Sequence, residues 1–162
     1  MRFIFLICFI TISYPLLAGC TDPAQQNVDW QRCYFDGKVL PKIDISGTNT
    51  KLRDSSFNRA DLSQANLEHV DGFHTKFITA TLVETNFKNA RLTEADFSRA
   101  NLEKTNFEGA NLRGARFFRA NAKGANFKNA EMQGADLSHA DFSNAIWADG
   151  RICKEGSIGQ CN

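Results

Sequence analysis

The sequence holds few of the residues that mark several common protein classes. It has only three prolines and eleven glycines among 162 residues, too few for a collagen or a low-complexity linker. An excess of charge of one sign is also lacking, because 19 lysines and arginines stand against 18 aspartates and glutamates. The resulting net charge of +1 excludes a histone-like polycation and an acidic tail. Hydrophobic residues nevertheless make up 43 %, which argues against an intrinsically disordered chain.

Residues that could carry catalysis or bind a metal are sparse and scattered. The three histidines, His69, His74 and His139, are scattered, and no CxxC spacing indicates a zinc site. The sequence has no glycine-rich phosphate loop and no serine in the context of a nucleophile paired with a base. Aspartate and asparagine recur instead at regular turn positions, where their side chains bond to the local backbone. We therefore expect a protein that is not an enzyme, with no catalytic residue, no cofactor and no metal.

The first twenty residues, MRFIFLICFITISYPLLAGC, have the pattern of a secretory signal peptide. Arg2 precedes an apolar run from Phe3 to Ile12, which is shorter than a typical transmembrane helix. Pro15 and small residues follow this run. The last four residues, Leu17-Ala18-Gly19-Cys20, resemble the lipobox of bacterial lipoproteins. An uncleaved apolar anchor and an ordinary signal peptide with a chance cysteine are the alternatives.

The lipobox resemblance implies a cellular location for the protein. In proteins with this motif the preceding peptide is removed and the thiol receives a diacylglycerol, so we expect residues 1–19 to be lost and Cys20 to carry lipid. Two or three acyl chains, palmitate among them, hold a protein on a bilayer far more firmly than one. Residues 20–32 then form the lipidated N-terminus and a polar tether. Thr21 stands where inner-membrane lipoproteins of Gram-negative bacteria carry aspartate, which favours the outer membrane, facing the periplasm.

Two of the remaining cysteines are placed to form a disulfide, in a compartment that permits one. Cys153 and Cys161 are eight residues apart, and Gly156 and Gly159 between them let the chain turn back. We expect this bridge to stabilise the C-terminal loop by about 2–3 kcal/mol. Two free thiols are the alternative.

A repeat of five residues runs from Thr50 to Asp149, twenty times without a gap. Each repeat has a small residue, a polar residue, an apolar centre and two further residues. The centre is phenylalanine in eight repeats and leucine in eight, and the small residue is alanine in fourteen. The polar residue is aspartate or asparagine in twelve. Such regularity indicates one structural unit used many times.

A period of five fits neither a helix nor a flat strand. On a helix, which turns about 100° per residue, successive centres would lie about 140° apart, and on a strand they would alternate between faces. All centres point inward only if the chain turns a corner in every repeat and coils around its own side chains. From Phe77 to Phe117 the centres alternate between phenylalanine and leucine, so an even number of repeats per turn stacks like on like. Two repeats are too tight and six leave a hole, so we predict four.

Runs such as Ala60-Asp61-Leu62, Ala95-Asp96-Phe97 and Ala110-Asn111-Leu112 resemble the pentapeptide repeat family. The resemblance implies an all-β fold, the right-handed quadrilateral β-helix, with about five full coils for twenty repeats. We expect this β-helix over residues 33–152 and a C-terminal cap loop over residues 153–162.

The N-terminal part of the β-helix is degenerate. Repeats centred on Phe35, Leu40 and Ile45 come before the regular array, with a two-residue bulge near Thr48-Asn49. Trp30 is a candidate to cap this end. In the same register Cys33 falls on the small inward position, so we expect a buried free thiol rather than a reactive one. An end-to-end dimer of the rod is left open.

Gly72 interrupts the array, since it stands where a leucine or phenylalanine belongs, and Phe73 follows it. We expect Phe73 to swing inward and fill the gap, because an empty core site costs several kcal/mol. The alternative is an exposed Phe73 in an apolar patch with Ile78 and Val83.

Residues twenty apart should lie above one another and form columns on each face. On one face Asn66, Asn86, Asn106 and Asn126 form a column whose amides can hydrogen-bond along the stack, so this face needs no function. The face centred on Phe57, Phe77, Phe97, Phe117 and Leu137 has a local charge of +3, whereas the other faces range from 0 to −2. We expect it to bind a partner through the following residues: Arg59, Lys76, Ile78, Arg99, Arg116, Phe118 and Arg119. The alternative is that the arginine stems merely cover Ile78 and Phe118.

These features favour a non-catalytic, lipid-anchored scaffold or interaction protein of the bacterial cell envelope. Its partners would be the membrane, through the lipid on Cys20, and an unknown protein or anionic envelope polymer. An effector or accessory protein that acts on another cell or host is the alternative. A DNA-mimicking, gyrase-binding role, known in this family, requires an acidic surface, but residues 50–149 hold 13 basic and 13 acidic residues. Nucleic acid is not expected as a partner, because a face of only +3 is weak for it and the protein lies outside the cytoplasm.

Overall fold

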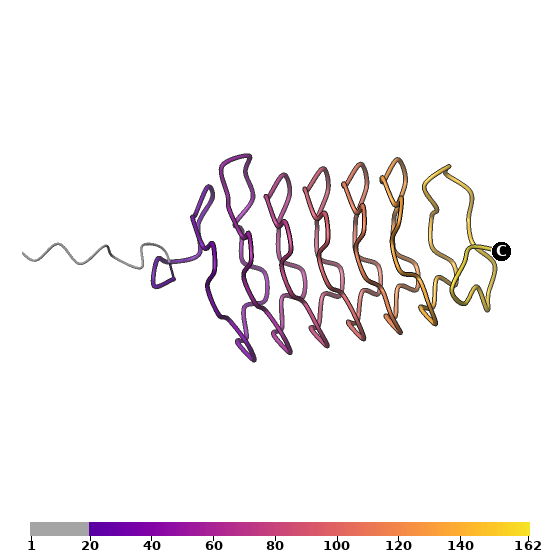
Figure 1. The fold of residues 1–162 in the computed structure, drawn as a ribbon, viewed down its shortest axis with the longest axis horizontal. Helices are drawn as coiled ribbons and strands as arrows, with labels where there is room; N and C mark the ends of the chain where they lie inside the picture. The colour runs from indigo at the N-terminus through magenta and orange to yellow at the C-terminus, as the bar shows by residue number, and fades with distance from the viewer. Residues whose placement is uncertain (1–19) are drawn as a thin grey trace, which may run out of the picture.

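The computed structural model describes residues 20–162, and the predicted signal peptide lies outside them. The described chain winds as a stack of coils from the N-terminal end to the C-terminal end (Figure 1). Within residues 20–162 the chain forms no helix, and its β-pairing consists of single-residue bridges between successive windings. This part of the chain accordingly contains no helix that is long and apolar enough to span a membrane.

A tight turn in every repeat produces the coil. Every fifth residue from Asp54 to Asn144 has a φ between 55° and 72°. The residue after it donates a backbone hydrogen bond to the residue three positions earlier, as Ser55 does to Leu52 at 3.0 Å. A positive φ before such a bond is the pattern of a type II turn. The chain therefore changes direction once per five residues, as the period predicts.

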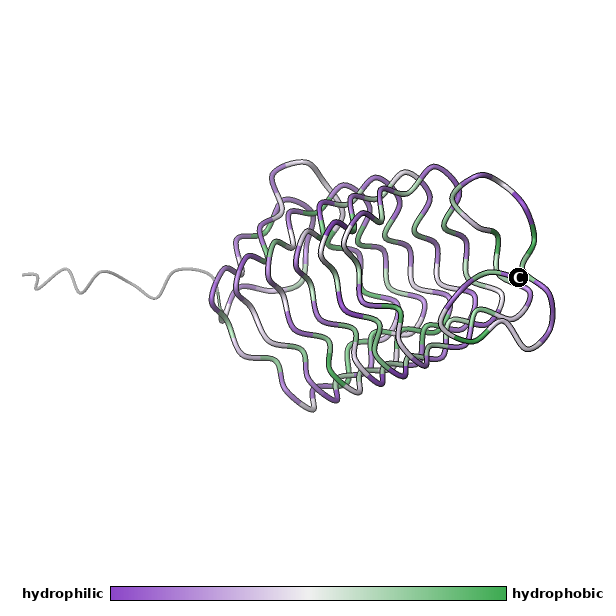
Figure 2. Ribbon diagram, turned by 45° about the vertical axis from the view of Figure 1, so that its right-hand side comes forward, coloured by the Kyte–Doolittle hydropathy of each residue, from purple (hydrophilic) through white to green (hydrophobic). Residues whose placement is uncertain are grey.

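Backbone hydrogen bonds join each winding to the next. Parallel bridges link residues twenty apart, from Lys51 with Asp71 to Asn126 with Ile146. The N–H of Leu52 donates to the carbonyl of Asp71 at 2.7 Å, and the N–H of Asp71 donates to the carbonyl of Thr50 at 2.9 Å. Twenty residues are four pentapeptides, so residues of the same type recur at corresponding places along the stack (Figure 2).

The core consists of stacked phenylalanine rings between layers of alanine and leucine. The rings of Phe77 and Phe97 stack at 5.1 Å between centroids, and those of Phe87 and Phe107 stack at 5.4 Å. Rings on neighbouring faces meet edge to face, as Phe77 and Phe87 do at 5.5 Å. All four rings are fully buried. Like side chains thus stack on like, as the sequence predicts.

Buried hydroxyl groups replace alanine in some repeats without leaving a polar atom unpaired. The hydroxyls of Thr75, Thr85 and Thr105 each donate to a backbone carbonyl in the previous winding, at 2.7–2.8 Å. These bonds explain how threonine is accepted at a fully buried position.

The first winding is longer than the others. Its bridges span 22 residues, from Asp29 with Lys51 to Asp44 with Asn66. The spacing between bridged residues changes from 22 to 20 between Asp44 and Lys51, where a two-residue bulge was predicted near Thr48-Asn49. The structure confirms this bulge. Trp30 is 2 % exposed and occupies the centre of a further repeat, so the stacking starts near Val28 rather than at residue 33.

The predicted asparagine column is present and hydrogen-bonded. The side-chain amide of Asn86 donates to the side-chain oxygen of Asn66 at 3.1 Å, and the pattern continues through Asn106 and Asn126. At the N-terminal end Asn66 donates to the carboxylate of Asp44 at 3.2 Å. These contacts give this face a structural role.

Phe73 does not fill the gap at Gly72, so that prediction is wrong. A Cβ atom on Gly72 would lie 2.9 Å from a methyl carbon of Leu92, which already occupies the space. Phe73 stays on the outside, half-buried, with the guanidinium of Arg53 over its ring at 4.7 Å. Leu92, from the next winding, therefore compensates for the missing side chain.

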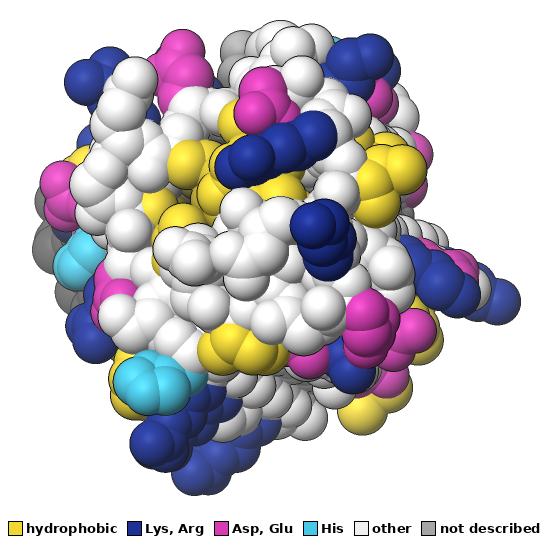
Figure 3. Space-filling view, turned by 90° about the vertical axis from the view of Figure 1, so that its right-hand side faces the viewer, with side chains coloured by type: hydrophobic (Ala, Val, Ile, Leu, Met, Phe, Trp, Pro, Cys, Tyr) yellow, Lys and Arg dark blue, Asp and Glu magenta, His cyan; other side chains and the backbone are white. Residues whose placement is uncertain are grey.

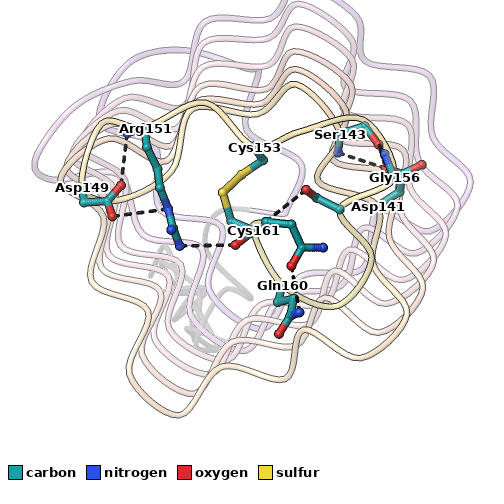
Figure 4. The surroundings of a disulfide bond; sticks show 10 residues. Asp141, Ser143, Asp149, Arg151, Cys153, Gly156, Gln160 and Cys161 are labelled. Carbon is teal, nitrogen blue, oxygen red and sulfur yellow. Dashed lines mark hydrogen bonds and ion pairs between the residues drawn. A yellow bond between two sulfur atoms is a disulfide. The ribbon is translucent and has the colours of Figure 1, made fainter.

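The C-terminal segment folds back and covers part of the last winding. Ile152 bridges Ile146 and Ile158 bridges Asp141, both antiparallel, so the parallel winding ends before residue 152, the predicted end of the β-helix. The predicted disulfide between Cys153 and Cys161 closes this segment (Figure 4). The antiparallel bonds occupy part of an edge that would otherwise be open for pairing.

Seen from the C-terminal end, hydrophobic side chains form separate patches among polar and charged ones (Figure 3). The repeat centres Met132 and Leu137 remain partly buried there, whereas Phe142 is fully buried. The bridges of the folded-back segment lie at Asp141 and Ile146, so its pairing falls on the later half of the last winding.

Substitution of Leu102 tests this register. Leu102 is fully buried, so Leu102→Arg buries an unpaired charge and should abolish the folded array. Leu102→Ala should lower the free energy of unfolding by about 2–5 kcal/mol, because it leaves a cavity. Lys104→Gln, two residues away and exposed, should change it by less than about 0.5 kcal/mol. Thermal unfolding measures all three, and equal midpoints would contradict the register.

Candidate interaction face

One face of the rod gathers basic and apolar side chains. We call it the basic face, and it comprises the outward residues of the repeats centred on Phe57, Phe77, Phe97, Phe117 and Leu137. The twenty-residue register places all of the predicted contact residues on it: Arg59, Lys76, Ile78, Arg99, Arg116, Phe118 and Arg119. Each repeat contributes three outward positions, so the face consists of three parallel columns.

The turn conformation sets the outermost column. Arg59, Arg99 and Arg119 occupy the left-handed position of their repeats, with φ of 57–59°. All three side chains are exposed. Because the positions are twenty residues or a multiple of twenty apart, the guanidinium groups lie along one line of the rod. Thr79 and His139 occupy the remaining places in this column.

Two hollows lie on either side of Ile78. Lys76, Asp96 and Arg116 line the first together with Ile78. Arg59, Thr79 and Arg99 line the second, again with Ile78. Asp36 and Gly37 of the first winding contribute to the second hollow, which could be found from the sequence only once the 22-residue spacing was known. Ile78 is thus the apolar wall shared by two hollows. Both also contain carboxylates, Glu94 and Asp96 in the first and Asp36 in the second.

Phe118 and Arg119 form a separate contact beyond these hollows. The guanidinium carbon of Arg119 lies 5.0 Å from the centre of the Phe118 ring, and the ring of His139 meets Phe118 edge-on at 5.7 Å. Arg119 therefore covers apolar surface in the manner of the alternative interpretation. No contact of this kind is found for Arg59 or Arg99 among the described residues.

The carboxylates of the face are held by local bonds. Asp96 accepts the backbone N–H of Ser98 at 2.9 Å and lies 3.7 Å from the guanidinium of Arg116. Hydrogen bonds from Ser138, followed by the charges of Arg116 and His139, lower the pKa of Asp136 despite some burial. Asp136 therefore stays charged at neutral pH. The two aspartates offset only part of the positive charge of the face.

Ser98 is a feature of the face that the sequence analysis did not single out. It is 9 % exposed, and its hydroxyl has no hydrogen-bond partner within residues 20–162. Ile78 and Phe118 flank it in its column, so a polar group lies between two apolar ones. The same position in the other repeats of this face holds Asn58, Ile78, Phe118 and Ser138, and this pattern does not indicate that the Ser98 hydroxyl is unpaired.

Two disulfides lie at the ends of the described chain. Besides the bridge between Cys153 and Cys161, Cys20 is paired with Cys33, with 5.3 Å between their Cα atoms. The expectation of a free thiol at Cys33 is therefore wrong for this form of the chain, although its burial is as predicted. The N-terminal segment loops back across the first winding and brings Cys20 to it.

This pairing bears directly on the lipid predicted for Cys20. One sulfur atom cannot carry both a disulfide and a thioether, so the two modifications exclude each other in the same molecule. As for metals, no cluster of three His, Cys, Asp or Glu side chains suited to an ion occurs in the described part of the chain.

Family comparisons agree with the repeat. A profile described as pentapeptide repeat region matches residues 50–127. A second profile, described as pentapeptide repeats in eight copies, matches residues 110–146. No catalytic family is indicated by these matches. No curated protein matches the chain.

Solved structures share the repeat solenoid. A trypsin-treated variant of QnrB1, a plasmid-mediated fluoroquinolone resistance protein, is 22 % identical with a TM-score of 0.57. The match covers 71 % of this chain and 52 % of that chain, so this chain spans about half the length of that protein. A pentapeptide repeat protein, Rfr23, from the cyanobacterium Cyanothece 51142 is 24 % identical, with a TM-score of 0.48 over 74 % of this chain and 90 % of that chain. At this identity the likeness to QnrB1 shows the fold alone.

The cysteine pairing predicts two distinct maps by mass spectrometry without reduction. In the mature lipidated protein, Cys153 and Cys161 should share one bridged peptide, and Cys33 should react with an alkylating agent only after unfolding. In a Leu17→Lys variant, whose disrupted lipobox prevents lipidation, Cys20 should instead be bridged to Cys33. A bridge from Cys33 to Cys153 or Cys161 would contradict the placement of these residues at opposite ends.

The unpaired hydroxyl of Ser98 predicts an unusual response to truncation. Ser98→Ala should leave the free energy of unfolding unchanged or raise it, because no hydrogen bond is lost. Ser143→Ala is the matched control, since that buried hydroxyl donates to Asp141 at 2.6 Å and accepts the N–H of Gly156 at 2.9 Å. It should cost about 1–3 kcal/mol. Chemical denaturation compares the two, and an equal loss at both positions would show that Ser98 has a partner.

Proposed function

Because the chain is a member of the pentapeptide-repeat family, we propose that it is a non-catalytic interaction protein, anchored by lipid on Cys20 to the bacterial cell envelope. The rod would be the right-handed quadrilateral β-helix of about five coils that the family resemblance implies. The outer membrane, on its periplasmic side, is the proposed location. The basic face would bind a partner protein or an envelope polymer that carries anionic groups.

The distribution of ion pairs is the observation that carries this proposal. Of the 13 basic residues between positions 50 and 149, seven form ion pairs within the described chain. The six without one are Arg59, Lys76, Arg99, Lys104, Arg119 and Lys128. Four of these six lie on the basic face. Elsewhere cations mostly face carboxylates, as Lys88 faces Glu108 at 3.4 Å.

The side chains that line the second hollow indicate the class of partner. Guanidinium groups bind carboxylate or phosphate groups through two parallel hydrogen bonds, which suits Arg59 and Arg99. Ile78 between them offers apolar contact, and arginine is enriched in protein interfaces. An acidic segment of a protein, or an envelope polymer with anionic groups, satisfies both requirements. A DNA-mimicking role is not supported, because a surface with unpaired cations does not imitate a polyanion.

The anchor rests on the sequence from Leu17 to Cys20 and is tested by its chemistry. The protein should fractionate with membranes, and globomycin, which blocks the lipoprotein signal peptidase, should cause the uncleaved precursor to accumulate. Cys20→Ser should abolish both effects. A cytosolic product without lipid would contradict the proposed location in the cell envelope.

The basic face is tested by a pair of matched variants. Arg59→Gln with Arg99→Gln removes two unpaired cations from the face, and Lys104→Gln with Lys128→Gln removes two from elsewhere. Both variants should stay in the membrane fraction and keep the parent's melting temperature, since no ion pair is lost. In intact cells, chemical crosslinking should recover the partner with the parent and the lysine variant, but several-fold less with the arginine variant. An unchanged partner profile in the arginine variant would show that the face is ordinary solvated surface.

A further inference from the structure

The first winding carries the most exposed large hydrophobic side chains of the described chain. Tyr34 is 80 % exposed and Val39 is 73 % exposed. Both occupy the polar position of their repeats, on neighbouring faces. In the next winding the same columns hold Ser56 and Asp61 instead. Ile146 in the last winding is also apolar at this position but is partly buried, so among the described residues the exposed apolar side chains at this position belong to the N-terminal winding.

Unpaired cations accompany these apolar groups. Arg32, Lys38 and Lys42 are exposed and form no ion pair within residues 20–162. Arg32 and Lys42 lie at turn positions, with φ of 58° and 59°, so they project from the corners of the winding. We call these three cations together with Tyr34 and Val39 the N-terminal rim.

The carboxylates of the same winding are occupied by other bonds. Asp29 pairs with Lys51 at 3.4 Å, and Asp36 accepts hydrogen bonds from Ser56 and Asn58 of the next winding. Asp44 accepts from Ser46 at 3.0 Å, and from Gln26 and Asn66. The three carboxylates keep their negative charge and equal the three cations in number. Their bonds hold them to other parts of the fold, so the cations are the charged groups left to bind a further molecule.

The chain holds this rim close to the site of the proposed lipid. Gln26 donates to Asp44 and Ser46, and the N–H of Asn27 donates to the carbonyl of Ser46 at 3.2 Å. Only six peptide steps separate Cys20 from Gln26. Fully extended, they reach about 20 Å. This limit does not depend on the disulfide between Cys20 and Cys33.

We infer that the N-terminal rim is a membrane-contact surface, which lies on the headgroups of phospholipids and holds the rod in a fixed orientation. The inference rests on the proposed lipid anchor and adds a second point of contact. Tyrosine is favoured at the membrane interface, with its ring among apolar groups and its hydroxyl in water. Arg32, Lys38 and Lys42 fit the phosphates of the headgroups and of anionic lipids.

The C-terminal segment carries a smaller surface of this kind, because Lys154 is the one exposed cation of residues 150–162 without an ion pair. Ile152 and Ile158 are also exposed, but they belong to the folded-back segment and bridge Ile146 and Asp141. Arg151, beside them, is paired with Asp149 at 3.4 Å. This end therefore supplies an internal control for any probe placed on the rim.

Depth-dependent fluorescence quenching tests the inference on the full lipidated protein. An environment-sensitive fluorescent amino acid replaces Tyr34 in one sample and Ile152 in another. Each protein is reconstituted into vesicles of phosphatidylethanolamine and phosphatidylglycerol that contain lipid with a spin label near the headgroup. Quenching at position 34 should be several times that at position 152. Adding Lys38→Gln and Lys42→Gln should reduce it.

The outcomes separate this inference from the anchor. If the protein floats with the vesicles but the probe at position 34 is quenched no more than that at position 152, the membrane contact is wrong and the anchor stands. If Tyr34 contacts a protein instead of lipid, the same absence of quenching results, and the inference falls. If the lipidated protein does not float with the vesicles at all, the anchor itself fails, and the inference fails with it.

Discussion

Every fifth residue from Asp54 to Asn144 has a positive φ, and the chain turns a corner there. An L-residue pays for this conformation, roughly 1–2 kcal/mol each, because its Cβ crowds the following carbonyl. Most of these positions nevertheless hold residues other than glycine, including Arg59, Thr79 and Arg119. The cost is met by what the corner makes possible, namely ladder bonds to both neighbouring windings and burial of one large side chain per repeat. Removal of the corner would lose both.

The same corner determines what the surface can present. Since a winding takes twenty residues, outward side chains align in columns, and in some columns the same kind of side chain recurs. Where the column is asparagine, the amides bond to one another and nothing is left for a partner. Where it is Arg59, Arg99 and Arg119, like charges repeat along the rod and cannot pair among themselves. On the basic face the regular core thus aligns several cations without ion pairs along one column.

The structure of the interior repeats could be predicted from the five-residue period. The structure of the two ends and of the irregular repeat at Gly72 could not. Centres such as Leu102 and the bulge at Thr48-Asn49 could be predicted, because each repeat meets only its neighbours in the stack. The pairing of Cys20 with Cys33 could not, since it depends on a loop with no repeat. Phe73 was misjudged because Leu92, twenty residues later, fills the space beside Gly72. The residues of the basic face could be predicted from the five-residue register. The unpaired state of the Ser98 hydroxyl could not, because it depends on where the neighbouring side chains lie.

The central claim is that one face of the rod meets a partner and the others serve the fold. Photo-crosslinking in living cells addresses it most directly, with a photoreactive amino acid at Ile78 or Phe118 on the basic face. Glu108 and Lys128, outward on the face centred on Phe107 and Phe127, provide the comparison. The account predicts discrete adducts from the first two positions and none from the other two. Adducts from all four positions alike, or from Glu108 and Lys128 only, would contradict it.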